Sequence, residues 1–177
     1  MSIRASLTGQ RNVCLTGLRP QSKIRKMALV SDPTNGNHAE APRGETGVEH
    51  RCGLTVRSYE CDAYGHVNNA NYLHFLEYAR HAYLRDNGIS IEDLRRAGYG
   101  LLVARIVIDF RRPSTTDDPL TVLTRPLRKT RIGGILSQRI LRDAETVAEA
   151  EVTWVCVDAR GRPARLPASF DRESLAP

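Results

Sequence analysis

Long apolar runs and paired cysteines are both missing from this 177-residue sequence. The best apolar run, residues 101–104, is interrupted by Arg105 and is far shorter than the about 20 residues of a membrane-spanning helix. The four cysteines are Cys14, Cys52, Cys61 and Cys156, and no two have the C-x-x-C spacing of a zinc or redox site. We therefore expect no membrane span, no bound metal, and a reducing compartment rather than a disulfide-stapled secreted fold.

Acidic residues are absent from the first 31 positions, which hold six basic ones: Arg4, Arg11, Arg19, Lys23, Arg25 and Lys26. The formal net charge of the whole chain is +6, so the rest of the chain is balanced. Nucleic-acid binding requires a cationic face on the folded body. The charge distribution therefore disfavours a nucleic-acid partner.

Residues 1–50 show neither a helical nor a strand period and contain Pro20, Pro33 and Pro42. This composition predicts a disordered basic N-terminal tail. Its acid-free, arginine-containing start resembles a transit peptide, which would place the protein in an organelle matrix. Alternatively, Met27 is the true start, which would remove all six cations and leave a neutral protein. We expect the cytoplasm, with the organelle as the alternative.

Residues 51–172 carry periodic patterns that predict a single folded domain, followed by a short tail over 173–177. Helices are expected over 72–87 and 91–97, and strands over 54–59, 102–110, 120–130, 132–142 and 146–158. A helix followed by a run of strands with short connections implies an α+β layer of antiparallel strands. One helix leaves a sheet face or edge uncovered, which predicts a homodimer or a homotetramer.

Several residues mark the expected ends and irregularities of these elements. Asn69 or Asn71 is expected to cap the long helix, and Ser90 the short one. Pro126 indicates an edge strand or a bulge. The pair Gly133 and Gly134 indicates a bulge or a bend.

The polar segment 59–73, between the first strand and the long helix, holds the candidate site. It contains Asp62, Gly65 and His66, followed by Asn68, Asn69 and Asn71. Backbone N–H groups at a helix start lack intrahelical partners and can stabilise a carbonyl oxygen that gains negative charge. Asp62 could attack that carbonyl or deprotonate a water. Equally, these residues could serve only as loop formers and helix caps.

The pattern Asp-x-x-Gly-His-Val-Asn-Asn-x-x-Tyr-Leu, with Phe75, Glu77 and Arg80 on the helix, resembles the hot-dog-fold acyl thioesterases. The similarity is to the 4-hydroxybenzoyl-CoA thioesterase branch and the single-domain acyl-ACP thioesterases. It implies a five-stranded sheet wrapped around one long helix. It also implies hydrolysis of an acyl-CoA or acyl-ACP substrate without a cofactor, at sites on a dimer interface.

The resemblance also implies roles for individual residues. Asp62 matches the catalytic carboxylate, Gly65 the turn into the helix, and the amide near Asn69 the group that polarises the thioester carbonyl. His66 matches a histidine of the acyl-ACP enzymes, but Tyr64 replaces the asparagine that accompanies it. Tyr64 and Tyr72 are expected to line the entrance. Glu77 is a substrate-binding candidate, because another hot-dog branch has its carboxylate on the helix.

Other polar clusters have plainer interpretations. His74, Glu77 and His81 share one helix side, but their spacing is not H-E-x-x-H and favours ordinary helix pairs over a metal site. Arg111 and Arg112 would suit the phosphates of coenzyme A, or simply a solvated surface. Two further function classes remain: a non-catalytic domain that binds acyl thioesters, and a hydratase, whose N-P-x-H-x-D motif is absent.

Overall fold

The computed structural model describes residues 49–177. The expected N-terminal tail, with its transit-peptide and Met27 alternatives, lies outside this part except for its last two residues. The elements in chain order are β1 (His50–Thr55), a 3-10 turn (Ser58–Glu60), α1 (Asn69–Asp86), α2 (Ile91–Arg96), β2 (Tyr99–Phe110), β3 (Pro119–Lys129), β4 (Gly133–Arg142), β5 (Glu145–Asp158) and a second 3-10 turn (Glu173–Leu175).

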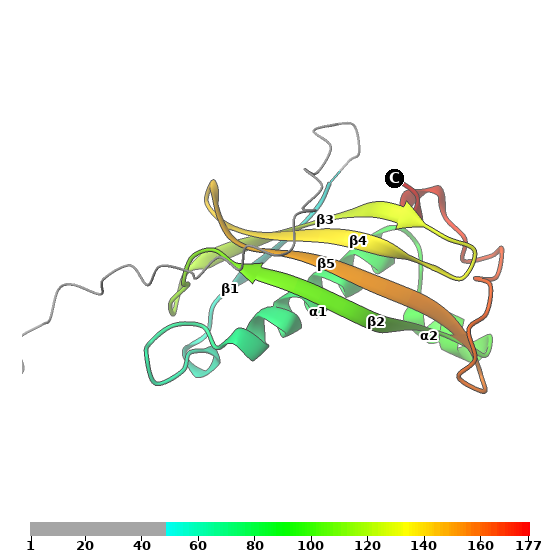
Figure 1. Ribbon diagram of the computed structural model, residues 1–177, viewed down its shortest axis with the longest axis horizontal. Helices are drawn as coiled ribbons and strands as arrows, with labels where there is room; N and C mark the ends of the chain where they lie inside the picture. The colour runs from blue at the N-terminus through cyan, green and yellow to red at the C-terminus, as the bar shows by residue number, and fades with distance from the viewer. Residues whose placement is uncertain (1–48) are drawn as a thin grey trace, which may run out of the picture. The chain divides into compact units, whose positions relative to one another are not determined.

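The five strands form one sheet in the order β1-β3-β4-β5-β2, and every neighbouring pair is antiparallel. The long helix α1 runs across one face of this sheet (Figure 1). This arrangement confirms the predicted α+β class and the sheet wrapped around one helix.

The position of β2 differs from what its short connection to β3 suggested. Strand β2 pairs with β5, from Tyr99 opposite Asp158 to Phe110 opposite Ala148, and so lies at the edge of the sheet. Strands β4 and β5 separate it from β3. Strands joined by a short connection usually pair with each other. Here the connection over residues 111–118 instead passes the ends of β5 and β4 before β3 begins.

Strand β2 also contains a bulge that the alternating pattern did not reveal. The register with β5 shifts between Val103 and Arg105, which leaves Ala104 as an extra residue. A single inserted residue reverses the sides to which the following side chains point. Val103 therefore shares a sheet face with Ile106, whereas a regular strand would place Leu102 there.

The first strand ends earlier than predicted, because the chain turns at residues 58–60. The carboxylate of Glu60 accepts a 2.7 Å hydrogen bond from the backbone N–H of Arg57, which stabilises a 3-10 turn. The strand predicted over 54–59 is thus wrong for residues 56–59, and β1 instead runs from His50 to Thr55.

Helix α1 begins at Asn69, and its cap is Asn68 rather than the predicted Asn69 or Asn71. The side chain of Asn68 accepts a hydrogen bond from the backbone N–H of Ala70. Ser90 caps α2 as predicted, through a 3.1 Å hydrogen bond from the N–H of Asp93.

Pro126 lies at a bulge of β3, as predicted, where the register with β4 shifts. Strand β3 itself is interior, but its ladder with β1 ends at Thr124, so Pro126 faces no strand on that side. Gly133 and Gly134 lie in a regular ladder with β5 rather than at the expected bulge. They are needed for close approach: a Cβ on Gly133 would lie 2.2 Å from the carbonyl oxygen of Trp154.

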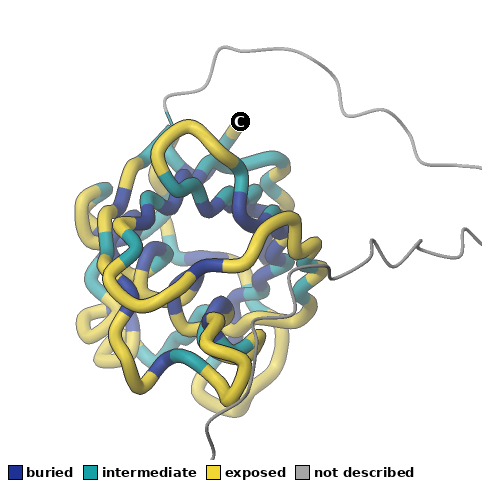
Figure 2. The backbone as a smooth tube through the Cα atoms, turned by 90° about the vertical axis from the view of Figure 1, so that its left-hand side faces the viewer, coloured by how far each residue is buried: buried dark blue, intermediate teal, exposed yellow. Residues whose placement is uncertain are grey.

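The space between α1 and the sheet holds two apolar clusters. One packs the first half of α1, around Tyr72 and Leu76, against β1, β3, β4 and β5. The other packs Tyr83 and Leu84 against Trp154 and the C-terminal segment. Buried segments from the helix and the sheet face one another in the interior, with exposed loops around them (Figure 2).

A buried polar network lies among these apolar residues. The side chain of Gln138, fully buried on β4, donates hydrogen bonds to the backbone carbonyl of Leu76 and to the hydroxyl of Thr124. It accepts a 2.9 Å bond from the guanidinium of Arg80. The network fixes the distance between α1 and the sheet, because the buried polar groups keep their hydrogen bonds only at that separation.

The last residues, expected as a short tail, pack onto the domain. Leu175 is 2% exposed and belongs to the second apolar cluster.

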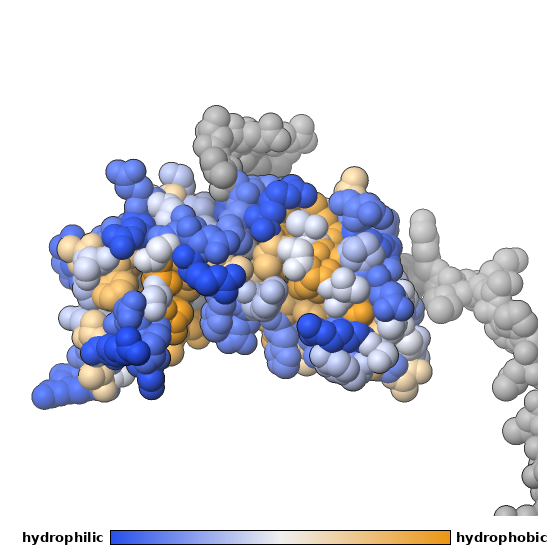
Figure 3. All heavy atoms as spheres, turned by 180° about the vertical axis from the view of Figure 1, so that it is seen from behind, coloured by the Kyte–Doolittle hydropathy of each residue, from blue (hydrophilic) through white to orange (hydrophobic). Residues whose placement is uncertain are grey.

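On the molecular surface, apolar side chains are visible in areas separated by hydrophilic ones (Figure 3). Within residues 49–177, no helix combines the length and apolar character that crossing a bilayer requires.

Candidate active site

The Asp62 loop is a tight turn held by its own backbone. The N–H of Asp62 donates to the carbonyl of His66 at 2.8 Å, and the N–H of Gly65 donates to the carbonyl of Asp62 at 3.0 Å. Gly65 has a φ of 78°, in the left-handed region that glycine adopts without strain. The turn therefore explains the glycine three residues after the aspartate.

One oxygen of the Asp62 side chain is fixed by the same turn. Its Oδ1 accepts a 2.8 Å hydrogen bond from the backbone N–H of Tyr64. No hydrogen bond from residues 49–177 reaches its Oδ2 in this structure. The carboxylate is thus oriented through one oxygen, while the other can act on a bound molecule.

The first turn of α1 leaves one backbone amide without a partner in the described chain. The N–H of Asn68 donates to the carbonyl of Glu60, that of Ala70 to the Asn68 side chain, and that of Asn71 to the Asn68 carbonyl. The N–H of Asn69 is bonded to none of residues 49–177. This amide also lies at the positive end of the helix dipole, where negative charge is stabilised.

The structure brings four of the predicted site residues to one surface hollow of about 480 Å³: Asp62, His66, Asn69 and Tyr72. Gly65 shapes the turn beneath it. Tyr64 is 86% exposed and does not line this hollow within the described chain. Asp62 and Asn69 thus line one space large enough for a small ligand.

The opposite wall of the hollow comes from the end of β2. Phe110, Arg111, Arg112 and Pro113 line it, and the Phe110 ring packs edge-on against Tyr72. No local pattern indicates this wall, since it lies about fifty positions from Asp62 in the sequence. Arg111 and Arg112, singled out for phosphates, form ion pairs of 3.2 and 2.9 Å with Glu149 and Glu145.

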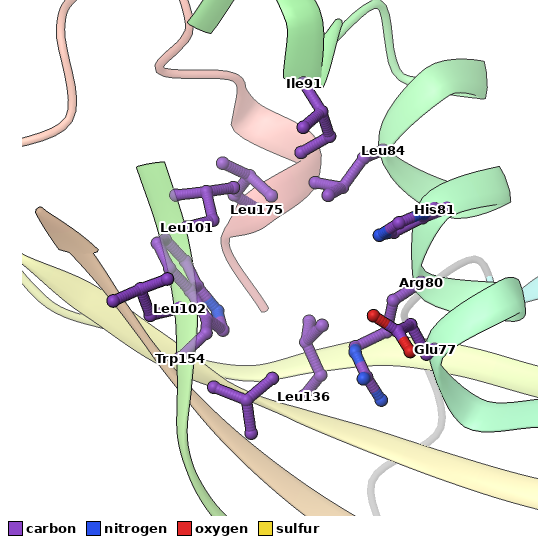
Figure 4. Close-up of a pocket in the computed structure, with 11 residues that line it drawn as sticks. Glu77, Arg80, His81, Leu84, Ile91, Leu101, Leu102, Leu136, Trp154 and Leu175 are labelled. Carbon is purple, nitrogen blue, oxygen red and sulfur yellow. The ribbon is translucent and has the colours of Figure 1, made fainter. Parts of the chain in front are cut away.

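Glu77 lies at a different place, a mostly apolar pocket of about 250 Å³ between α1, α2, β2 and the C-terminal turn. Figure 4 shows Glu77 and Arg80 at one end of this pocket, and Leu84, Ile91 and Leu175 at the other. Partial burial lowers the pKa of the Arg80 guanidinium, and the nearby charge of Glu77 acts in the opposite direction. We call this space the apolar pocket.

The three residues considered for a metal do not converge. Glu77 and His81 line the apolar pocket, whereas His74 lines a separate hollow beside β1. Within residues 49–177, no three histidine, cysteine, aspartate or glutamate side chains are grouped closely enough to hold a metal ion.

An aspartate and the first residue of a helix that line one hollow form a set of groups suited to acyl transfer. The fold around them is the hot-dog fold of thioester hydrolases. A model of the Thioesterase-like superfamily matches residues 56–173. The chain belongs to the Thioesterase-like superfamily, which confirms the predicted class of enzyme.

Individual relatives agree with this assignment. The chain is 39% identical to the long-chain acyl-CoA thioesterase FadM of Escherichia coli over 124 residues, which cover 69% of this chain and 93% of FadM. It is 35% identical over 135 residues to the chloroplastic acyl-acyl carrier protein thioesterase ATL2 of Arabidopsis thaliana, covering 71% of this chain and 69% of ATL2.

Solved structures show the same architecture. A probable thioesterase from Bartonella henselae matches with a TM-score of 0.65 and 30% identity, over 68% of this chain and all of that one. The probable thioesterase YbaW of Escherichia coli matches with a TM-score of 0.60 and 34% identity, over 68% of this chain and 92% of that one.

Proposed function

We propose that this protein hydrolyses an acyl thioester, with Asp62 as general base or nucleophile and the backbone amide of Asn69 as the donor to the carbonyl oxygen. The observation that carries the proposal is the shared hollow: Asp62 and Asn69 both line it, and the Asn69 N–H has no partner among residues 49–177. No cofactor is needed for this chemistry.

In the general-base route, Asp62 takes a proton from a water, whose oxygen attacks the carbonyl carbon. Negative charge on the carbonyl oxygen is stabilised by the Asn69 N–H. The carbon–sulfur bond then breaks, and the thiolate takes up the proton. In the nucleophilic route, the Asp62 carboxylate attacks the carbonyl carbon and displaces the thiolate, which leaves a mixed anhydride on the enzyme. Water then cleaves the anhydride, which releases the acid and restores the carboxylate, and a proton from that water goes to the thiolate. His66, on the same hollow, orients the water or the substrate.

The substrate carrier is coenzyme A or acyl carrier protein. The names of the relatives support both, since FadM is an acyl-CoA enzyme and ATL2 an acyl-carrier enzyme. Arg111 and Arg112 border the hollow and supply positive charge near its opening, although carboxylates already neutralise them in part.

The working enzyme is a homodimer, or a homotetramer built from two such dimers, joined through the free edge of β2. Several side chains along this edge are exposed although apolar: Leu102, Val103, Val107 and Phe110. Antiparallel pairing of two β2 strands about their midpoint places the Phe110 end of one copy beside the Tyr99 end of the other.

Because Phe110 lines the Asp62 hollow and Leu101 lines the apolar pocket, this pairing sets the hollow of one copy beside the pocket of the other. The acyl group would then lie between the helix and the sheet of the partner subunit. Light scattering should give at least twice the mass of one chain, and a monomer that hydrolyses thioesters would refute the arrangement.

The test of the chemistry is free-thiol release from a panel of acyl-CoA and acyl-carrier thioesters. We expect Asp62→Ala to lower kcat at least ~100-fold, the usual contribution of a positioned acid or base. Asp143→Asn, in the exposed β4–β5 turn, is the charge-matched control and should retain activity. Glu77→Ala should cost far less than Asp62→Ala. Full turnover by Asp62→Ala would overturn the assignment.

The same assay separates the alternatives. A domain that only binds acyl thioesters would release no thiol, and a hydratase would yield a 3-hydroxyacyl product. The binding-only alternative is less well supported, because recognition alone does not require a carboxylate beside the carbonyl-binding amide.

A further inference from the structure

The apolar pocket has an exposed rim and a buried interior. Glu77, His81, Leu102 and Val103 at the rim are exposed, whereas Leu136, Trp154 and Leu175 inside are at most 8% exposed. Leu175 differs from the other interior residues, because it belongs neither to the helix nor to the sheet. It comes from the C-terminal 3-10 turn, and Figure 4 shows it beside Leu101 and Leu84.

Two anchors hold this turn in place. The hydroxyl of Tyr83 on α1 donates a hydrogen bond to the backbone carbonyl of Ser174. The ammonium of Lys129 on β3 pairs with the carboxylate of Asp171 and donates to the carbonyl of Arg172. The turn is therefore bound to both layers of the fold, and Leu175 is held against the pocket rather than left free to withdraw.

We propose that the C-terminal turn, through Leu175, is the inner wall that limits the length of the acyl group. The proposal rests on the proposed function, since it takes the apolar pocket as the acyl site. Pockets for drug-sized ligands usually enclose roughly 300–1,000 Å³. The 250 Å³ here suits a short or medium-chain acyl group and is small for a long one.

The experiment compares kcat/KM for butanoyl-, octanoyl-, dodecanoyl- and hexadecanoyl-CoA in wild-type protein, Leu175→Ala and Leu175→Phe. Wild type should prefer the shorter members. Leu175→Ala should raise the ratio of kcat/KM for hexadecanoyl-CoA to kcat/KM for octanoyl-CoA at least about tenfold. One methylene group accommodated in an apolar pocket has an effect of that size, and the substitution makes room for more than one. Leu175→Phe should lower the ratio of dodecanoyl to butanoyl hydrolysis.

Leu166→Ala is the matched control, because Leu166 belongs to the same apolar cluster but does not line the pocket. It should lower the melting temperature like Leu175→Ala without changing the chain-length ratios. If Leu175→Ala does not fold, Leu175→Val makes the same test with a smaller change in volume.

Three results would overturn the proposal: a wild-type preference for hexadecanoyl-CoA, unchanged ratios in folded Leu175 variants, or an equal change in Leu166→Ala. The loss of the proposed function itself would look different, because wild-type protein would then hydrolyse no member of the panel on either carrier.

Discussion

The side-chain amide of Asn71 donates a 2.7 Å hydrogen bond to the backbone carbonyl of Glu60, eleven positions earlier in the chain. The same carbonyl accepts the N–H of Asn68. One oxygen thus ties the loop that carries Asp62 to the first turn of α1, which carries the Asn69 amide. The separation of these two groups depends on this link.

We expect Asn71→Ala to lower kcat more than it changes KM, because the carboxylate and the amide lose their fixed spacing while the hollow remains. The cost in unfolding free energy should be about 1 kcal/mol, as for other single hydrogen bonds. Urea unfolding and steady-state kinetics measure the two effects.

Asn87→Ala provides the control at the other end of α1. The Asn87 amide donates a comparable 2.7 Å bond to the carbonyl of Tyr83. Its loss should cost similar stability but leave kcat unchanged. Equal kcat losses in the two variants would show that Asn71 only stabilises the fold.

The buried Tyr83 hydroxyl predicts an alkaline loss of stability. Burial raises the pKa of Tyr83 from 10 to about 12. Below pH 10 both folded and unfolded states hold the proton, so its contribution is fully present. Above pH 10 the unfolded state loses its proton first, and stability falls as the pH rises toward 12.

Tyr83→Phe should lack this part of the alkaline decline and should be about 1 kcal/mol less stable near neutral pH, because the Ser174 carbonyl loses its donor. Tyr78→Phe, which changes an exposed ring, is the control for the loss of a hydroxyl. Parallel stability–pH curves for wild type and Tyr83→Phe between pH 9 and 12 would contradict the prediction.

Gly133→Ala should destabilise the protein by about 3 kcal/mol, because the new methyl group would overlap the backbone of β5 at Trp154. Gly53→Ala, in β1, is the matched control, since no atom lies within 4 Å of the position that the new Cβ would take, and the change should be nearly neutral. Thermal unfolding of both variants measures the difference, and similar melting temperatures would rule out the close contact.

The local features of the site were readable from the sequence because they depend on neighbouring residues. The turn at Gly65 depends only on the positive φ angle of that glycine. The cap of α2 depends only on a hydrogen bond between Ser90 and Asp93, three residues further along the chain. The alternation along β5 likewise indicates that Ala148, Val152 and Trp154 share one face of the strand, and the structure buries all three.

Other features depended on contacts between distant parts of the chain. The pairing of β2 with β5, the bulge at Ala104 and the wall from Phe110 to Pro113 follow from packing across the sheet. Leu175 looked like the end of a tail, yet Tyr83 and Lys129 hold its turn against the core. Residue order alone was enough for the family, the succession of elements and the glycine turn after Asp62. What faces that turn and what closes the apolar pocket became known only from the folded chain, because long-range burial rather than local propensity fixes those contacts.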